Sequence, residues 1–418
     1  MSVRFAVIKK QLTVPLPIYL SGYFNRSEPA TEMHDPLNIS CFYVEDNDKA
    51  VAVFGLDILG IYGDFYEKFI DAVKAKISFP NLQMVFSSAH THSAPGFRGF
   101  EEDQKLLLNA DVFFEEIVNK AVLILQEAPD VAKPAALSYS EKPVEGVGAN
   151  RRDKNVKVNT ILHTLAFDFE DKKAVVVNFN CHPTHMSAKN LLVSKDFQGI
   201  AMDELVEQDY LPMYLQGACG DISTRFTRVD QTFEDMARIA HLFAEEIKNV
   251  DVIEKFTVDD FDYSEHYFDV PKKVYKEEEF YLSEIAKFEN NLKEAIAASM
   301  PAADLRILET ALEGIRVEYH YSTKQDQINI SIRCGILRLA DKVAMVFLPF
   351  ELFSKLADQI TAGSKVPYTM VVGYSFNGLG YMPDSASYDK SGYEILSCVY
   401  EKGSGEIVAE SVIALLNQ

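Results

Sequence analysis

Two histidines separated by one residue lie in the segment Ser87–Ser93, where His90 and His92 flank Thr91. In an extended backbone, residues two apart point to the same side, so both imidazoles can face one pocket. Neutral imidazole is the commonest protein ligand of zinc. On this pair alone, a metal site and two ordinary hydrogen-bonded histidines both remain open.

A third histidine and a glutamate could complete such a site. His182 follows the apolar run Ala174–Phe179, and Glu351 stands between two apolar residues, where burial without a partner would be costly. Catalytic zinc typically takes three protein ligands and leaves a position for water, which fits this set of residues. For Glu351 taken alone, a place at a helix N-terminus, stabilised by the helix dipole, is an equal alternative.

The segment Gln216–Ser223 combines small residues with Asp221 and Ser223. Its glycines allow backbone N–H groups to approach a substrate closely. It is not a G-x-S-x-G nucleophile elbow, because no matching second glycine follows Ser223. A structural turn and a substrate-contacting turn are equally consistent with this pattern, and the spacing does not specify a Ser-His-Asp nucleophile.

The elements that must position these residues are apolar, β-branched runs that end in polar residues. We expect strands at Lys49–Leu56, Leu82–Phe86, Ala174–Phe179, Met213–Leu215, Val343–Leu348 and Thr369–Val372. Segments with helical spacing lie between them, at Leu106–Glu127, Phe233–Ile247, Glu277–Ala297 and Ala303–Arg316. Loops at the carboxyl ends of strands converge on ligands in sheets flanked by helices. The pattern predicts an α/β protein with mixed β-sheets flanked by helices.

Three further features of the sequence allow either a structural or a functional interpretation. The acidic stretch Asp259–Glu279 is expected to be a solvated connection into a surface helix, with a lid over a site as the alternative. Asp57 and Asp196 could orient metal-binding histidines through hydrogen bonds or be ordinary polar residues. His185 is expected to be a surface or structural histidine.

Composition excludes several classes of partner. The chain has 41 Lys and Arg against 62 Asp and Glu, a net charge of −21, which disfavours nucleic acids and polybasic membrane binding. The N-terminus lacks the apolar core of a secretory signal, and no apolar run reaches the ~18–20 residues of a transmembrane helix. The five cysteines are scattered and odd in number, which favours reduced thiols. We therefore expect a cytoplasmic protein without a transmembrane segment and leave its oligomeric state open.

Five motifs, in order along the chain, resemble the neutral, non-lysosomal ceramidases. They are Ser88–Gly96, Asn178–Thr184, Gln216–Ser223, Leu348–Glu351 and the series Tyr381, Tyr388 and Tyr393. Together they extend over most of the chain. The resemblance implies the α/β catalytic domain of that family and a Zn²⁺-dependent hydrolase that cleaves an N-acyl amide of a small molecule by attack of zinc-bound water.

The same resemblance implies a role for eight residues. The family's zinc ligands correspond to His90, His182, Glu351 and Tyr381, the tyrosine being assigned from the spacing of the tyrosine series. The family's groups around the scissile amide correspond to His92, Arg151, Ser223 and Tyr393. Arg151 and Tyr393 would donate to the oxyanion and His92 would move the proton. Ser223 would position or polarise the substrate, with a covalent nucleophile as the alternative.

The sequence departs from the family in ways that leave the substrate open. Thr224 and Arg225 stand where Pro-Asn usually follows the serine motif, and Arg98 lies in place of a glycine-rich stretch. With Arg228, these cations favour polar or anionic substrates over ceramide. The chain shows neither a secretion signal nor the family's C-terminal immunoglobulin-like domain, so we expect a single catalytic domain over residues 1–418. The alternatives are a metal-dependent esterase, an N-acetyl-sugar deacetylase, or a zinc- or ligand-binding protein without catalysis.

Overall fold

Three β-sheets form the frame of the computed structural model, which describes residues 3–23, 26–46, 49–97, 108–170, 172–323, 329–390 and 392–418. The first sheet has the order β1-β3-β4-β5, with β4 and β5 parallel and the other pairs antiparallel. Its strands are β1 (Arg4–Gln11), β3 (Asn38–Glu45), β4 (Ala50–Leu56) and β5 (Leu82–Ser88). Helices α1 (Phe65–Lys74) and α2 (Ala110–Val131) pack beside it. Every residue of β3 and β4 is buried, which explains why the sequence of β4 is a continuous apolar run rather than an alternation.

The second sheet has the order β11-β9-β8-β6-β13 and packs against the first through β11. Its strands are β6 (Ala136–Pro143), β8 (Ile161–Asp168), β9 (Lys173–Phe179), β11 (Tyr210–Gln216) and β13 (Glu254–Phe256). Only β9 and β11 are parallel. Helices α3 (Asp196–Val206) and α4 (Phe233–Lys248) pack on each other, and α3 packs on β11.

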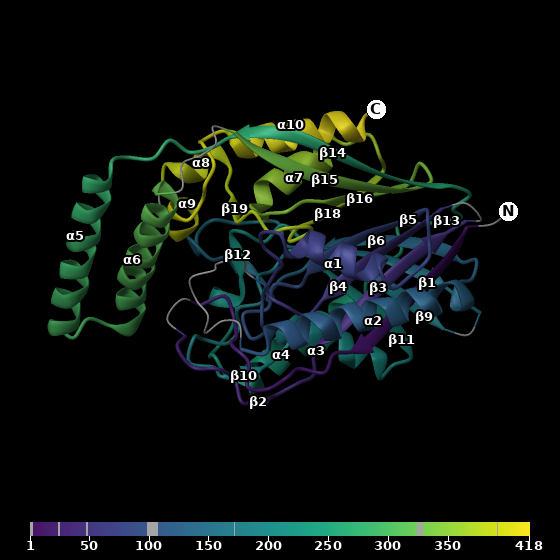
Figure 1. The fold of residues 1–418 in the computed structure, drawn as a ribbon, viewed down its shortest axis with the longest axis horizontal. Coiled ribbons are helices and arrows are strands. Elements are labelled where there is room, and N and C mark those ends of the chain that lie inside the picture. The colour runs from purple at the N-terminus through teal and green to yellow at the C-terminus, as the bar shows by residue number, and fades with distance from the viewer. Residues whose placement is uncertain are drawn as a thin grey trace.

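The third sheet has the order β14-β15-β16-β18, with β16 and β18 parallel. Its strands are β14 (Phe261–Pro271), β15 (Asn329–Leu339), β16 (Val343–Phe347) and β18 (Tyr368–Val372). Helices α7 (Ser354–Gly363) and α10 (Ser404–Leu416) cover it at the upper side of Figure 1. The predicted class, mixed sheets flanked by helices, is confirmed, and the six predicted strands match strands of these sheets within a few residues.

Short elements join the sheets near the site. Three two-stranded pairs are formed by β2 (Glu32–Met33) with β10 (Leu192–Val193), β7 (Ala149–Asn150) with β12 (Ile222–Ser223), and β17 (Glu351–Leu352) with β19 (Tyr381–Met382). A 3₁₀ turn (Thr224–Phe226) and the short helices α8 (Ser385–Tyr388) and α9 (Tyr393–Leu396) are the other short elements that the structure describes.

One helical hairpin stands apart from the sheets. Figure 1 shows α5 (Glu278–Ala297) and α6 (Ala302–Ser322) side by side at the left, beyond α8 and α9. Helix α6 packs on α9, so the hairpin reaches the body next to Tyr393. No described helix is both long enough and apolar enough to cross a membrane.

The predicted solvated connection at Asp259–Glu279 is wrong over most of its length. Residues Phe261–Pro271 form β14, which pairs with β15 along eleven residues at the edge of the third sheet. The acids are compatible with an edge strand because they have partners: Glu265 accepts a hydrogen bond from Arg333 Nε at 2.8 Å. Among the predicted helices, α2 begins at Ala110, and residues 106 and 107 of the prediction lie outside the described part of the chain.

Candidate metal centre

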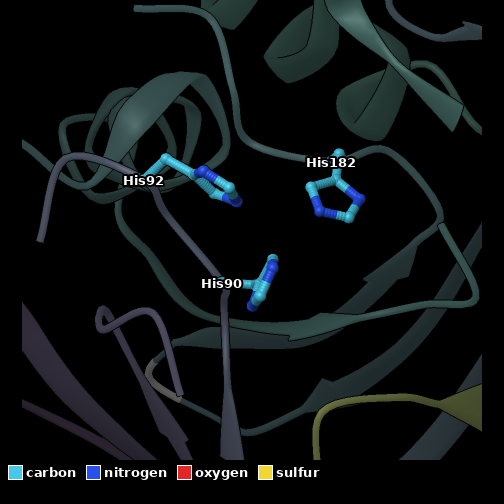
Figure 2. Close-up of side chains that lie close together, drawn as sticks. All are labelled: His90, His92 and His182. Carbon is cyan, nitrogen blue, oxygen red and sulfur yellow. The ribbon is translucent and has the colours of Figure 1, made fainter. Parts of the chain in front are cut away.

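Three histidines from two sheets converge on one point. His90 and His92 follow β5 of the first sheet, and His182 follows β9 of the second. One ring nitrogen of each can be chosen so that all three lie within 4.8 Å of one another. Figure 2 shows the three rings arranged around a shared centre, His92 and His182 from opposite sides and His90 from below. The expectation that both imidazoles of the H-x-H pair face one pocket agrees with this arrangement.

His90 is held in an unusual backbone conformation. Its φ is 66°, in the left-handed region that costs a non-glycine residue about 1–3 kcal/mol. Its Nδ1 lies 2.7 Å from the Leu59 carbonyl oxygen, and its ring lies 4.2 Å from that of Tyr374. A carbonyl can only accept, so Nδ1 carries a proton and Nε2 is the nitrogen left for a metal.

His182 is fixed in the same tautomer by another carbonyl. Its Nδ1 lies 2.9 Å from the Cys219 carbonyl oxygen, and its side chain is fully buried. Burial, followed by the positive charge of Arg151, lowers the pKa of His182 to about 4. The ring is therefore neutral at physiological pH and Nε2 has a free lone pair.

Glu351 brings a carboxylate oxygen to both of these nitrogens. Its Oε2 lies 3.4 Å from His90 Nε2 and 3.2 Å from His182 Nε2, and neither Oε2 nor His182 Nε2 has a hydrogen-bond partner among the described residues. Burial alone would raise the pKa of Glu351, but His90 and His182 outweigh it and hold the pKa well below its usual range. One carboxylate oxygen and two imidazole nitrogens turn their lone pairs toward one another here, so a cation, either a proton or a metal ion, must lie among them. The donor set fits Zn²⁺, which takes imidazole nitrogen and carboxylate oxygen.

Tyr381 lies beside Glu351. The two residues are paired neighbours in the parallel pair β17–β19, and the Tyr381 hydroxyl accepts a hydrogen bond from Arg151 Nη2 at 2.8 Å. The Tyr393 ring lies 6.0 Å from that of Tyr381. Sequence positions more than 200 residues apart, Arg151 and Tyr381, are thus brought together at the site.

Arg151 is anchored by a carboxylate that the sequence did not single out. Its Nε donates to Glu394 Oε1 at 2.8 Å, and Arg152 Nε lies 3.5 Å from the other oxygen of Glu394. Burial alone would lower the pKa of Arg151, but Tyr381 and Glu394 raise it well above its usual range. The guanidinium is therefore charged. Glu394 directly follows Tyr393, and this position next to a predicted site residue could have identified it from the sequence.

The Gln216–Ser223 turn links several parts of the site. Gly220 N donates to the Leu352 carbonyl, and a Cβ at Gly220 would lie 2.4 Å from the Glu351 carbonyl oxygen. Asp221 accepts hydrogen bonds from the backbone N–H and the hydroxyl of Ser354, the first residue of α7. The turn therefore has a structural role, and only glycine fits at position 220.

Ser223 is nearly buried next to His182. The two residues form an isolated parallel bridge, and Ser223 Oγ accepts a hydrogen bond from the Arg225 backbone N–H at 3.2 Å. This is the hydrogen bond that Oγ makes among the described residues. The hydroxyl proton is therefore free to be donated, and no general base lies within hydrogen-bond distance of it in the described part of the chain.

His92 differs from the other two imidazoles, because no carbonyl among the described residues fixes its tautomer. Neither ring nitrogen has a hydrogen-bond partner, and its ring packs against Tyr23 at 4.9 Å. Gly22, at φ 97°, lies so close that a Cβ would be 2.4 Å from His92 Nδ1. Burial is the largest cause that lowers the pKa of His92 well below its usual range.

For Asp57 and Asp196, the structure favours the alternative of ordinary polar residues. Asp57 accepts hydrogen bonds from Asn38, and Asp196 accepts from the backbone N–H groups of His185 and Phe197, so neither orients a candidate ligand. Backbone carbonyls do this instead. His185 is structural as expected, but it is fully buried rather than on the surface.

Tyr374 was missed as a site residue. It stacks on His90, and its hydroxyl lies 3.1 Å from Cys219 Sγ. Its position just after a predicted strand could have identified Tyr374 as a site residue from the sequence. Arg98, which the sequence placed near the entrance, lies outside the described residues.

The fold and the arrangement of these residues define an α/β protein of the ceramidase fold. Neutral ceramidase from Pseudomonas aeruginosa superposes with a TM-score of 0.74 at 16% sequence identity, over 99% of this chain and 73% of that one. A structure described as ceramidase complexed with C2 superposes with a TM-score of 0.73 at 15% identity, over 99% and 74% of the two chains. The resemblance seen in the sequence is thereby confirmed at the level of the fold. Comparison of the sequence with protein-family models and with curated proteins gives no match.

Proposed function

We propose that the protein is a zinc-dependent hydrolase that cleaves an N-acyl amide bond of a small molecule. The observation that carries the proposal is the approach of two buried imidazole Nε2 atoms, each with its proton held on Nδ1 by a carbonyl, to one oxygen of Glu351. The fold shared with ceramidases supports the amide as the scissile bond.

His90, His182 and Glu351 would hold the metal, and Tyr381 is the fourth proposed ligand. Its hydroxyl now accepts from Arg151 and lies beside Glu351 in the strand pair. Bound Zn²⁺ would supply a water whose pKa is lowered toward about 7 and a Lewis acid for a carbonyl oxygen. Every other step falls to the chain's own side chains.

Arg151 and Tyr393 would stabilise the oxyanion that develops when the amide carbonyl is attacked. The charged guanidinium of Arg151 is fixed by Glu394, so it costs little reorganisation during the reaction. His92, with both nitrogens unpartnered, would take a proton from the attacking water and deliver it to the leaving amine. Ser223 would donate its free proton to the substrate and orient it.

A second ligand set is available, because His92 lies as close to the other two histidines as a ligand would. In that arrangement, His90, His92 and His182 would bind the metal and no histidine would be left to move the proton. His92→Ala separates the two. Retained zinc with lost turnover supports the proton-transfer role, whereas lost zinc supports three histidine ligands.

Metal analysis of the purified protein tests the proposal. We expect one zinc per chain in the wild type and its loss in His90→Ala and His182→Ala. His241→Ala is the matched control, because His241 is exposed on α4 and pairs with Glu204 at 3.0 Å rather than with a proposed site residue. A wild type without stoichiometric zinc, or ligand variants that keep it, would refute the metal site.

A panel of substrates tests the reaction class. N-acyl amides should be hydrolysed, and their turnover should fall in Arg151→Gln while zinc is retained. Turnover of esters alone, or of acetylated amino sugars alone, would replace the amide by the esterase or deacetylase alternative. Bound zinc without hydrolysis of any member would favour a binding protein.

A further inference from the structure

Three arginines near the candidate metal centre have no carboxylate partner among the described residues. Arg26, Arg225 and Arg228 donate instead to backbone carbonyls. A guanidinium has five donors and a full charge, so one to three carbonyl contacts leave both partly unsatisfied. Arg26 is the extreme case, because it is 9% exposed and its Nη2 has no hydrogen-bond partner. Its burial lowers its pKa to about 10, so it remains charged.

This pattern is unusual for the chain. With 62 acidic residues against 41 basic ones, carboxylates are abundant, and most other described arginines form ion pairs. Those arginines are Arg4, Arg151, Arg152, Arg238, Arg306, Arg316 and Arg333. Arg338 donates to the last carbonyls of α10, where the helix dipole is negative. Among the described residues, the arginines without a carboxylate or helix-end partner are therefore these three.

All three arginines contact the backbone of segments that carry the site. Arg26 Nη1 donates to the His92 carbonyl at 3.0 Å, and Arg228 Nη1 donates to the Thr184 carbonyl at 2.7 Å, two residues beyond His182. Arg225 Nη1 donates to the Arg151 carbonyl at 3.1 Å. Tyr23 lies between these groups, with its ring 5.1 Å from the Arg26 guanidinium and 4.9 Å from the His92 ring.

The charges act on one another across this region. The pKa of Arg225 is lowered, first because neighbouring groups displace part of the water around its otherwise exposed side chain, and then by the positive charges of Arg151 and Arg228 among others. Asp196 and Asp235 partly offset the charge of Arg228, but neither forms a hydrogen bond or ion pair with it. A local excess of positive charge in a protein of net charge −21 focuses anions to this place and away from the rest of the surface.

We propose that Arg225 and Arg228 bind an anionic group of the substrate, a carboxylate or a phosphate, beside the candidate metal centre. The inference rests on the proposed hydrolase function and names the substrate class: an N-acyl amide whose amine or acyl part carries a negative charge. Arg225 is exposed and makes a single side-chain hydrogen bond, so its remaining donors are available to such a group. Arg26, which donates to the His92 carbonyl, adds a fixed positive charge next to the site.

Paired substrates that differ in charge test the proposal. One pair is N-octanoylglycine with N-octanoylglycinamide, and the other is N-octanoyl-O-phosphoethanolamine with N-octanoylethanolamine. We expect kcat/KM to be at least about tenfold higher for the charged member of one pair, as charge-assisted hydrogen bonds produce. The pair with the larger ratio distinguishes a carboxylate from a phosphate. Arg225→Gln and Arg228→Gln should each lower that ratio several-fold.

Arg316→Gln is the matched control, because Arg316 pairs with Glu289 on the hairpin and should leave the ratio unchanged. A wild-type ratio near one overturns the proposal, as does an equal loss for both members of a pair, which would mean that the arginines only brace loops. If no member is hydrolysed, the proposed hydrolase function fails, and calorimetric titration with the same pairs decides the subsite separately. Tighter binding of the charged member, weakened by Arg225→Gln, supports it, and equal affinities refute it.

Discussion

Glu394 bridges two arginines at the centre of the site. It fixes the Nε side of Arg151, which leaves Nη2 directed at the Tyr381 hydroxyl. Glu394→Gln should therefore lower kcat about tenfold with little change in KM, because a hydrogen bond to a charged group is worth about 1.5–3 kcal/mol. Steady-state kinetics on an N-acyl amide checks this.

Glu289→Gln is the control for Glu394→Gln, since Glu289 also pairs with an arginine but on the exposed hairpin. Zinc content and unfolding temperature should match the wild type in both variants. If Glu394→Gln lost zinc or stability in proportion to its activity, the residue would be structural rather than a positioning residue.

Asp196 should give stability a distinctive pH dependence. Burial, against the backbone N–H groups that it accepts from, raises its pKa from 3.8 to about 7. The folded state thus binds this proton more tightly than the unfolded state. The contribution of the Asp196 carboxyl to the free energy of unfolding is therefore greatest below about pH 4, falls as pH rises to about 7, and is constant above that pH. Asp196→Asn removes this term. Relative to the wild type, its free energy of unfolding should rise by about 3 kcal/mol between about pH 4.5 and 7.5.

Urea unfolding at several pH values measures the Asp196 effect. Asparagine tolerates the positive φ of 61° at this position, so backbone strain is not added. Asp209→Asn is the matched control, because Asp209 also has a positive φ, 65°, but is exposed. A difference from the wild type that does not change with pH would contradict the raised pKa.

At the scale of single residues, the sequence predicted which side chains would meet but not what orients them. His90, His182 and Glu351 were recognisable because their types and their places after apolar runs are visible in the sequence. The groups that fix their tautomers, the carbonyls of Leu59 and Cys219, are common to every residue and depend on tertiary packing alone. No side-chain pattern could have identified them.

Helix α9 carries Tyr393, and the α5–α6 hairpin holds it in place. Gly314 of α6 lies so close to α9 that a Cβ would be 2.9 Å from Leu396 Cβ and 3.5 Å from Tyr393 Cα. Lys273 Nζ links Glu318 of α6 to the Ile395 carbonyl of α9. The hairpin therefore acts as a support behind a site residue.

Gly314→Ala tests that support. Alanine favours helix over glycine by up to about 1 kcal/mol, so in a free helix the change would stabilise. Here we expect the hairpin to be displaced and turnover to fall about three- to tenfold with zinc retained. Ile307→Ala, at a position 64% exposed on the same helix, is the control. A more stable Gly314→Ala protein with full activity would show that α9 does not depend on the hairpin.

At the scale of elements, some fully buried strands were predictable, and β3 and the polar edge strand β14 were not. Strand β3 is buried throughout, but Asn38, Ser40 and Glu45 interrupt its apolar pattern. Strands such as β4 and β16 are buried at every residue, so their composition is unmistakable. Strand β14 is exposed or half-buried at most positions, and its polar residues resemble those of a loop. What makes it a strand is its pairing with β15, which no local pattern encodes.

At the scale of the whole molecule, each of the three sheets supplies a proposed ligand. His90 follows β5 of the first sheet, His182 follows β9 of the second, and Glu351 follows β16 of the third. Order along the chain suggested such convergence, because polar residues follow so many strands. The sequence did not predict which sheets would pack against each other. The contacts between sheets, such as the hydrogen bond from Gly373 N to the Gln216 carbonyl, are made by the backbone and leave no side-chain pattern. A site built from all three sheets favours the single domain proposed for residues 1–418.

Because the proposed ligands come from all three sheets, metal binding should stabilise the whole molecule rather than one part. At a free zinc concentration about a thousandfold above Kd, binding adds about 4 kcal/mol to the free energy of unfolding. With an unfolding entropy of about 2 cal/mol/K per residue, 418 residues convert this into a rise of about 5 °C in Tm. Calorimetry of the protein with zinc and after chelation should show one cooperative transition that moves as a unit, and His182→Ala should abolish the shift. Two transitions, only one of which responds to zinc, would contradict both the single domain and a metal centre shared by the three sheets.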